Sequence, residues 1–372
     1  MNRSTFILLL GTIVAGSVHE TYAAEDPAGT AQSVRERFQL EEARAPISES
    51  SGWRKPKRIL VVGWSARLIE QLQAIDPGVE FVTAKSAAEA PSKAADVDAV
   101  IGACTPELLA AGKAIRWIQT YTAGVENCVA IPAVRERSIV LTNMQRISGP
   151  VMAEHVLAML FALTRGLDVF ITAQSKRTWE RDAADGRMTL VRGKTMLVVG
   201  LGGIGTEVAK LAHAAGMRVI ATRASGRAGP DFVSYVGLPD ELLKLAAEAD
   251  VVVNTAPLTP QTTGVFNAEF FGKMKPAAYF INVGRGKSVV TSALVDALSG
   301  NKIAGAGLDV TDPEPLPADH PLWRTPNVIV TPHVANDSDL GFDVQAEVIK
   351  DNTRRYVAGE RMLSVVDVAR GY

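Results

Sequence analysis

Short apolar runs alternate with longer segments of mixed apolar and polar residues along most of the chain. In the first half, the apolar runs occupy residues 58–62, 79–82, 97–101, 116–119 and 138–142. Segments rich in helix-forming residues lie between them, including 66–74 and 106–111. Continuous apolar runs that alternate with helices are typical of parallel strands covered on both faces. The first half is therefore expected to form a doubly wound α/β domain.

The same alternation returns in the second half, after one long helix. Residues 149–165 are apolar almost all round, which predicts a buried helix that crosses between two domains. Further strands are predicted at 196–199, 219–221, 251–254, 279–283, 304–309 and 328–330, and a last amphipathic helix at 339–358. The predicted fold class is α/β, with two doubly wound parallel-sheet domains and a cleft between them. A Rossmann cofactor domain spans 148–334, and a flavodoxin-like substrate domain combines 57–147 with 335–372.

One glycine-rich turn gains a chemical meaning from its position between a predicted strand and a predicted helix. It reads Gly200-Leu201-Gly202-Gly203-Ile204-Gly205. Gly200 permits a tight turn, Gly202 lets the backbone approach a pyrophosphate, and Gly205 lets helix and strand pack closely. The pyrophosphate then binds unpaired N–H groups at the helix N-terminus. A glycine turn without a ligand is the simpler alternative, but the context predicts a dinucleotide site.

The second strand of this unit ends in Thr222 and Arg223, where an acidic residue usually binds the ribose 2′-hydroxyl. A guanidinium instead pairs with a 2′-phosphate through two parallel hydrogen bonds. The expected cofactor is NAD(P), with NADP favoured over NAD. Arg223 as a solvated loop residue is the alternative.

Composition narrows the function classes. The 372 residues include 39 basic and 40 acidic ones, and no stretch has the basic excess of a nucleic-acid site. The two cysteines, Cys104 and Cys128, are too few for a metal cluster or a disulfide framework, and the histidines lack zinc-site spacing. No nucleic-acid partner and no bound metal are expected.

The N-terminus has the order of a secretory signal peptide. Arg3 precedes a charge-free apolar stretch at 6–18, and Ala23-Ala24 offers a cleavage site. Residues 1–24 are expected to be removed, which would leave a periplasmic or secreted protein without stable membrane insertion. Residues 25–56 are expected to form a linker with one short helix around 31–42. An uncleaved anchor, or a misassigned start of a cytoplasmic protein, is the alternative. Cys104 and Cys128 could meet in an oxidising compartment, but we expect free thiols.

Three predicted strands end in polar residues of complementary chemistry. Arg285 follows one strand in a glycine turn, Glu314 follows another in an acidic and proline-rich stretch, and His333 follows the third after Thr-Pro. Ligands of open α/β sheets bind outside the carboxyl ends of the strands. An arginine and an acid–histidine pair beside a nicotinamide would form a site for hydride transfer. Each residue alone could be a helix cap or a solvated loop residue.

These segments, together with the glycine turn, resemble the D-isomer-specific 2-hydroxyacid dehydrogenases over residues 57–368. Further matches are Ala123-Gly124-Val125-Glu126, Ala153-Glu154-His155, Gln174 with Trp179, Ala256-Pro257-Leu258-Thr259 and the stretch 352–359. The arginine after the second cofactor strand resembles glyoxylate/hydroxypyruvate reductases, and the phosphoglycerate dehydrogenase-like branch is also similar. Asn336-Asp337 depart from the small residues usual in the family, which leaves the size of the substrate open.

The resemblance implies roles for individual residues. His333 would be the acid/base that protonates the carbonyl oxygen, Glu314 would favour its charged form, and Arg285 would bind the substrate and polarise its carbonyl. Backbone N–H groups of Thr122, Ala123, Gly124 and Val125 would hold the substrate carboxylate. Asn282 and Asp309 would lie near the nicotinamide, and Pro257 would complete the cofactor site.

The resemblance also implies a reaction and an assembly. The expected reaction moves a hydride between NAD(P)(H) and a small 2-oxo or D-2-hydroxy acid. The arm at 166–189 would embrace a second subunit, so a homodimer is expected. An NAD(H)-sensing binding protein of the same fold and a phosphite dehydrogenase are the alternatives, whereas Glu314 argues against the formate dehydrogenases, which have glutamine there.

Overall fold

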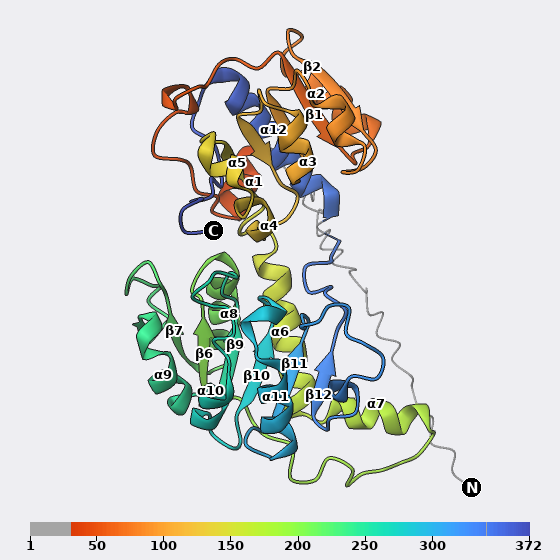
Figure 1. The fold of residues 1–372 in the computed structure, drawn as a ribbon. Helices are drawn as coiled ribbons and strands as arrows, with labels where there is room; N and C mark the ends of the chain where they lie inside the picture. Colours follow the sequence, from red (N-terminus) through yellow and green to blue (C-terminus); the bar gives the residue numbers. More distant parts are fainter. Residues whose placement is uncertain (1–30, 340) are drawn as a thin grey trace, which may run out of the picture.

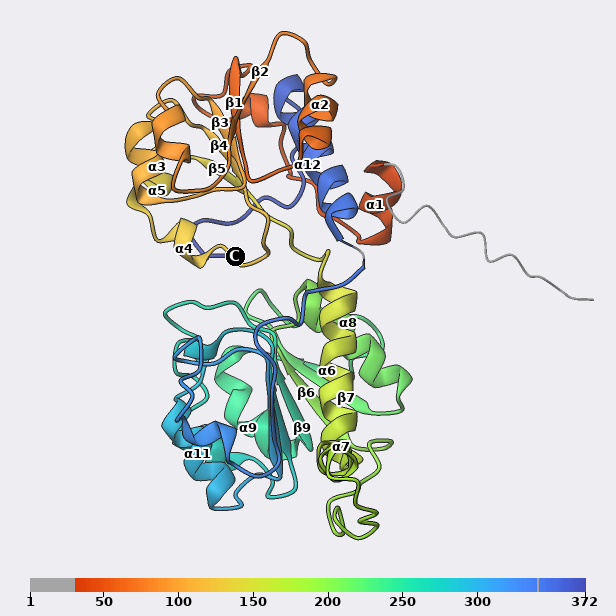
Figure 2. The same ribbon diagram turned by 90° about the vertical axis from the view of Figure 1, so that its right-hand side faces the viewer.

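Two parallel sheets, each covered by helices on both faces, form the molecule (Figures 1 and 2). The computed structural model describes residues 31–339 and 341–372. Within both sheets the strands pair in parallel. The predicted fold class is therefore confirmed. The predicted signal peptide, 1–24, lies outside the described residues.

The first sheet has five strands in the order β2-β1-β3-β4-β5. Their bounds are β1 Arg58–Val62, β2 Glu80–Ala84, β3 Ala99–Ile101, β4 Trp117–Gln119 and β5 Val140–Thr142. Side chains of a strand point alternately to opposite faces. In β1, Ile59 and Val61 accordingly pack in one buried cluster, and Leu60 and Val62 pack in another.

Helices cover both faces of this sheet. α2 (Ala66–Gln73) and α12 (Gly341–Ala358) contribute to the cluster of Ile59, and α1 (Ala31–Arg37) contacts α12. α3 (Pro106–Ala111) and α5 (Pro132–Glu136) lie on the opposite face (Figure 2). The short α4 (Glu126–Val129) follows the loop after β4. The chain thus returns to the first sheet with α12, after it has built the second one.

The second sheet has seven strands in the order β12-β11-β10-β9-β6-β7-β8. Their bounds are β6 Thr195–Val199, β7 Arg218–Thr222, β8 Tyr235–Gly237, β9 Val251–Asn254, β10 Tyr279–Asn282, β11 Gly305–Leu308 and β12 Val328–Val330. The strand order changes direction between β6 and β9. This switch point is where ligands of open α/β sheets bind, and the glycine turn begins directly after β6.

The helices that cover the second sheet form two groups, one on each face of the sheet. α6 (Gly149–Thr164) and α8 (Gly203–Ala214) pack with Met196 and Val198, whereas α9 (Leu242–Glu248), α10 (Ala268–Lys273) and α11 (Thr291–Ser299) pack with Leu197 and Val199. α7 (Leu167–Ser175) follows α6 after a sharp bend. Short 3-10 helices lie at Ile47–Glu49, Ala90–Lys93, Pro239–Glu241, Gly286–Ser288 and Pro321–Trp323. In the described part of the chain no single helix meets the length and apolarity needed to cross a membrane; α6 and α7 do so only as a pair bent by 73°.

The stretch predicted as a loosely ordered linker is part of the first domain from Ala31 onward. Val34, Phe38, Leu40 and Ile47 are buried in the same cluster as Ile59. The backbone around Glu42 pairs with Leu363 near the C-terminus in an antiparallel bridge. Four apolar side chains spaced through a polar segment form too weak a pattern to predict this packing.

Candidate active site

The glycine turn after β6 has a tight bend at Gly200 and close packing at Gly205. Gly200 has a φ of +96°, and a Cβ there would lie 2.8 Å from the Ala256 backbone. A Cβ on Gly205 would lie 2.1 Å from the Gly200 carbonyl oxygen, so only glycine lets α8 approach β6 this closely. A Cβ on Gly202, in contrast, would meet no heavy atom within 4 Å, so there is open space beside the backbone at this residue.

The start of α8 fits a bound pyrophosphate. Gly202 precedes the helix and offers no side-chain cap, so the first N–H groups, those of Gly203, Ile204 and Gly205, have no intrahelical acceptor. Thr222 holds the turn in place, because its carbonyl accepts hydrogen bonds from the N–H groups of Gly200 and Leu201 at 3.1 Å. These residues can hold the phosphates of a dinucleotide.

Arg223 lies at the end of β7, beside this turn. Its side chain donates to the carbonyl of Ala228 at 3.0 Å, and among the described residues it has no carboxylate partner. The neighbouring Arg227, in contrast, pairs with Glu241 at 2.7 Å and donates to the Tyr235 hydroxyl. Arg223 is therefore the arginine of this loop whose charge is not neutralised by an ion pair. Pro257, also predicted to contact the cofactor, is exposed beyond β9.

His333 and Glu314, the two residues predicted to act as an acid–base pair, lie within hydrogen-bond distance of each other. His333 Nδ1 lies 2.5 Å from Glu314 Oε1, and both side chains are partly exposed. The bond to Glu314 uses Nδ1, so Nε2 is the ring nitrogen that can face a substrate. His333 itself has a φ of +58°, a conformation that the surrounding structure must hold in place.

Asp309 holds the loop of His333. Its buried carboxylate accepts hydrogen bonds from the N–H groups of Val334 and Ala335 at 2.9 and 3.0 Å, and from the Thr331 hydroxyl at 2.6 Å. The His333 N–H donates to the Asp309 carbonyl. Because these contacts occupy the carboxylate, Asp309 supports the histidine loop rather than presenting a free acid.

Asn282 has a matching role for the arginine. Its side chain is fully buried, donates to the Arg285 carbonyl at 3.0 Å and accepts from the Gly284 N–H at 3.1 Å. The sequence predicted that Asn282 and Asp309 would lie near the nicotinamide. The structure gives both side chains partners in the loops that carry Arg285 and His333, which spacing alone does not reveal.

The loop after β4, residues 122–125, presents unpaired N–H groups. Its carbonyls are occupied: that of Thr122 accepts from Met144, that of Ala123 from Asn143, and that of Gly124 from the Thr122 hydroxyl. Within the described chain, none of the four N–H groups of this loop has a protein acceptor. A loop fixed through its carbonyls, with free N–H groups, is suited to bind a carboxylate.

Arg285 lies against this loop and connects the two domains. Its Nε donates to Glu126 Oε1 at 2.6 Å, and its Nη2 lies 3.4 Å from Oε2. A Cβ on Gly124 would come within 1.6 Å of Nη2, so the guanidinium packs directly on the glycine backbone. The predicted substrate arginine and substrate loop are therefore brought together.

Glu126 is a site residue to which the sequence motif assigns no role. Burial raises the pKa of its carboxyl, but the hydrogen bond and charge of Arg285 outweigh this effect and hold the pKa below its ordinary value, with a smaller contribution from His333. Glu126 is therefore an anion in contact with Arg285. Its place in the Ala-Gly-Val-Glu motif is visible in the sequence, but its partner lies far away along the chain.

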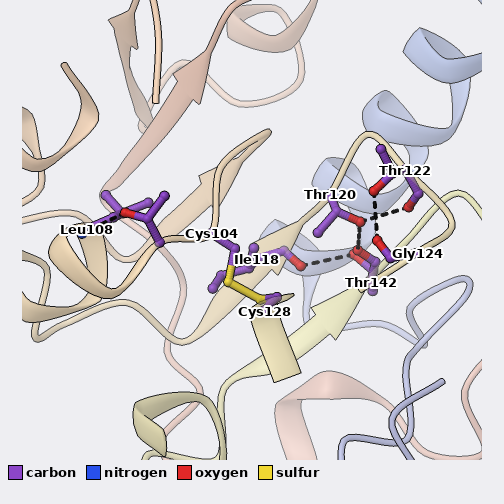
Figure 3. Close-up of a disulfide and its surroundings, with 9 residues drawn as sticks. Cys104, Leu108, Ile118, Thr120, Thr122, Gly124, Cys128 and Thr142 are labelled. Atoms are coloured by element: carbon purple, nitrogen blue, oxygen red, sulfur yellow. Dashed lines mark hydrogen bonds between the residues drawn. A yellow bond between two sulfur atoms is a disulfide. The ribbon is translucent and has the colours of Figure 1, made fainter. Parts of the chain in front are cut away.

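A disulfide joins the loop after β3 to the short helix that follows the substrate loop (Figure 3). It joins Cys104, in the loop between β3 and α3, to Cys128 of α4, with the Cα atoms 5.5 Å apart. The expectation of free thiols is therefore wrong. Cys104 follows β3 and Cys128 follows β4, and these neighbouring strands end at the same edge of the sheet. The position of the two cysteines in the fold therefore predicts their pairing better than their number does.

Clusters of metal ligands are absent from the described residues: no group of three or more His, Cys, Asp or Glu side chains could hold an ion. His155, on α6, lies 3.0 Å from the Thr331 hydroxyl and so belongs to the hydrogen bonds behind the His333 loop.

Comparison with known proteins gives a consistent picture. Residues 59–200 match the family model described as D-isomer specific 2-hydroxyacid dehydrogenase, catalytic domain, and residues 157–335 match the model of the corresponding NAD binding domain. A putative 2-hydroxyacid dehydrogenase of Haemophilus influenzae is 36% identical over 246 residues, which cover 63% of this chain and 76% of the relative. Glyoxylate/hydroxypyruvate reductase A of Photorhabdus laumondii is 32% identical over 279 residues, covering 74% of this chain and 87% of the relative.

The fold is also similar to solved structures. A D-isomer specific 2-hydroxyacid dehydrogenase from Xanthobacter autotrophicus, solved in complex with NADPH and MES, has a TM-score of 0.71 and 30% sequence identity. The match covers 84% of this chain and 99% of that one.

Proposed function

Because the chain belongs to the D-isomer specific 2-hydroxyacid dehydrogenase family, we propose that it moves a hydride between NAD(P)(H) and a small 2-oxo or D-2-hydroxy acid. The observation that carries this proposal is the arrangement of three groups: the free N–H groups of residues 122–125, the Arg285 guanidinium against them, and the His333–Glu314 pair. A carboxylate binder and a proton donor are what a 2-oxo acid requires.

When the 2-oxo acid is reduced, each group of site residues has a separate role. The loop N–H groups and Arg285 bind the substrate carboxylate, and Arg285 also polarises the carbonyl. A bound reduced nicotinamide would supply the hydride that the carbonyl carbon, C2, takes up. His333 gives its proton to the carbonyl oxygen, so the C=O bond becomes a hydroxyl, and Glu314 stabilises the charged imidazole beforehand.

The proton donor distinguishes this proposal from a sensing role. A protein that only senses NAD(H) has no need of a histidine oriented by a carboxylate. Asp309 and Asn282 add a rigid support for each loop, which is what catalytic groups require. Phosphite oxidation remains the alternative activity, and an assay of the purified protein with phosphite and NAD(P)⁺ tests it.

NADP is the proposed cofactor. Arg223 has no carboxylate partner among the described residues and lies beside the glycine turn, where a 2′-phosphate would need a cation. The NADPH complex of the Xanthobacter autotrophicus protein supports this proposal by similarity.

A homodimer is proposed from an exposed apolar surface on α7 and the loop after it. The side chains of Leu167, Ile171 and Trp179 are 45%, 63% and 97% exposed, and Met188 and Leu190 extend the surface. The loop is fixed against α7 by the ion pair of Arg187 with Asp168 at 2.9 Å. Large apolar side chains on an ordered arm are typical of a subunit interface.

Export is proposed from two independent features. The N-terminal segment has the order of a signal peptide, and the disulfide is of the kind that persists in oxidising compartments.

His333→Ala is expected to lower kcat for 2-oxo acid reduction by about 10²–10⁴, with little change in cofactor affinity, because the proton donor is lost. Glu314→Gln should retain more activity, and its rate should decline at lower pH than that of the wild type. Steady-state pH profiles of both variants test the pair. Near-normal turnover without His333 would refute the assignment.

Arg223→Asp is expected to weaken NADPH binding by roughly ten- to a hundred-fold, because a charge-assisted bidentate contact becomes a repulsion. NADH binding should change little. Cofactor KM values measured at saturating substrate test this, with Arg227→Asp as the control, since Arg227 is already paired with Glu241. Equal effects of Arg223→Asp on both cofactors would contradict the proposal.

Light scattering at micromolar concentration should give twice the mass of one chain for the wild type. Trp179→Glu should shift the protein towards monomer, because a charge would be buried in the interface. Val365→Glu, at an exposed residue of the first domain, serves as the control and should remain dimeric. A monomeric wild type would remove the dimer.

Mass spectrometry of the native protein should find a mature N-terminus at Ala24 or Glu25 and Cys104 linked to Cys128. Both observations are expected from the same molecule, because cleavage and oxidation accompany export. An intact Met1 in the cytosolic fraction, together with two free thiols, would contradict the proposal.

A further inference from the structure

The site holds a second carboxylate besides Glu314, and it contacts the group that would bind the substrate. Glu126 faces the Nε and Nη2 edge of Arg285 with both oxygens, at 2.6 and 3.4 Å. The remaining Nη1 donates to the Gly284 carbonyl at 2.8 Å. The two-point edge that best fits a carboxylate is therefore already occupied by a carboxylate of the protein itself.

The position of Glu126 is fixed by its surroundings. It begins α4, directly after Val125, whose side chain is buried. Two residues further on, Cys128 is also buried and is joined by the disulfide to Cys104, in the loop after β3 (Figure 3). The backbone of Glu126 is thereby anchored at the start of α4, next to the loop of residues 122–125.

The guanidinium also closes the space above the loop. Arg285 packs on Gly124, where a Cβ would overlap its Nη2. A substrate carboxylate that binds the N–H groups of 122–125 must therefore displace Arg285 from Gly124. It must also replace Glu126 as the acceptor of the Nε and Nη2 hydrogen bonds of Arg285. After this exchange, one guanidinium balances the substrate carboxylate, and Glu126 remains beside it as an unbalanced negative charge.

We propose that Glu126 determines substrate specificity, by selecting 2-oxo acids with a single carboxylate and an uncharged side chain against those with a second negative group. This inference rests on the proposed function and names its substrate class. A second carboxylate or a phosphate on the substrate would lie close to Glu126 and be repelled, whereas a hydroxyl group could donate a hydrogen bond to it.

The test compares substrates and ligands that differ by one charge. The kcat/KM values for hydroxypyruvate and oxaloacetate are measured for the wild type, Glu126→Gln, Glu126→Asp and Glu136→Gln. Glu136 is an exposed acid at the end of α5, so its variant removes the same charge from the same domain away from the site. Calorimetry on the NADP⁺-saturated protein, with oxamate and its dianionic counterpart oxalate, gives affinities without turnover.

The wild type should prefer hydroxypyruvate over oxaloacetate and bind oxamate more tightly than oxalate. Glu126→Gln should shift both ratios towards the dianion by about tenfold, the order of effect of one unit charge several ångström away. Glu126→Asp and Glu136→Gln should keep the wild-type ratios.

Two results would overturn the inference. One is a folded Glu126→Gln, with wild-type NADPH affinity, whose ratios stay within about twofold of the wild type. The other needs no variant: a wild type that binds oxalate as tightly as oxamate. If the wild type reduces no 2-oxo acid, the proposed reaction fails, and the oxamate and oxalate affinities still decide the role of Glu126.

Discussion

The packing of the Arg285 guanidinium on the Gly124 backbone joins the two domains at the candidate site. Arg285 follows a strand of the cofactor sheet, and Gly124 lies in a loop of the substrate sheet. Any side chain at residue 124 would push the guanidinium away, so the glycine determines the distance between the cation and the loop N–H groups. The ion pair with Glu126 then fixes the orientation of the guanidinium.

Buried polar side chains hold this arrangement from behind. Asn282 bonds the backbone of the arginine turn, and Asp309 bonds three groups of the histidine loop. Leaving such buried groups unpaired costs free energy, so each loop has one favoured conformation. The site is therefore fixed by residues that need not touch a substrate themselves.

Features that depend on residues close together in the sequence could be predicted from the sequence. The glycine turn, the strands that end in Arg285, Glu314 and His333, and the crossing helix α6 each follow from a few consecutive residues. The apolar runs predicted most strands to within one or two residues, β1 and β9 among them. β8 and the helices α4, α5, α7, α9, α10 and α11 were not predicted, and the shortest of them, β8, α4 and α5, have too few apolar residues to form a clear period.

Contacts between distant segments could not be predicted in this way. The pairing of Glu126 with Arg285, the packing of Phe38 into the first domain and the disulfide all join residues whose proximity depends on the completed fold. Cys104 and Cys128 came nearest to prediction, because both were placed at the ends of neighbouring strands, but with only two cysteines in the chain free thiols were expected.

The most direct test of the proposed chemistry is the reaction itself. Purified protein is incubated with NADPH and a small 2-oxo acid such as hydroxypyruvate, and the product is resolved on a chiral column while NADPH oxidation is followed. The proposed function predicts one mole of D-2-hydroxy acid for each mole of NADPH oxidised. No oxidation with any small 2-oxo acid and either cofactor, or formation of the L isomer, would contradict it.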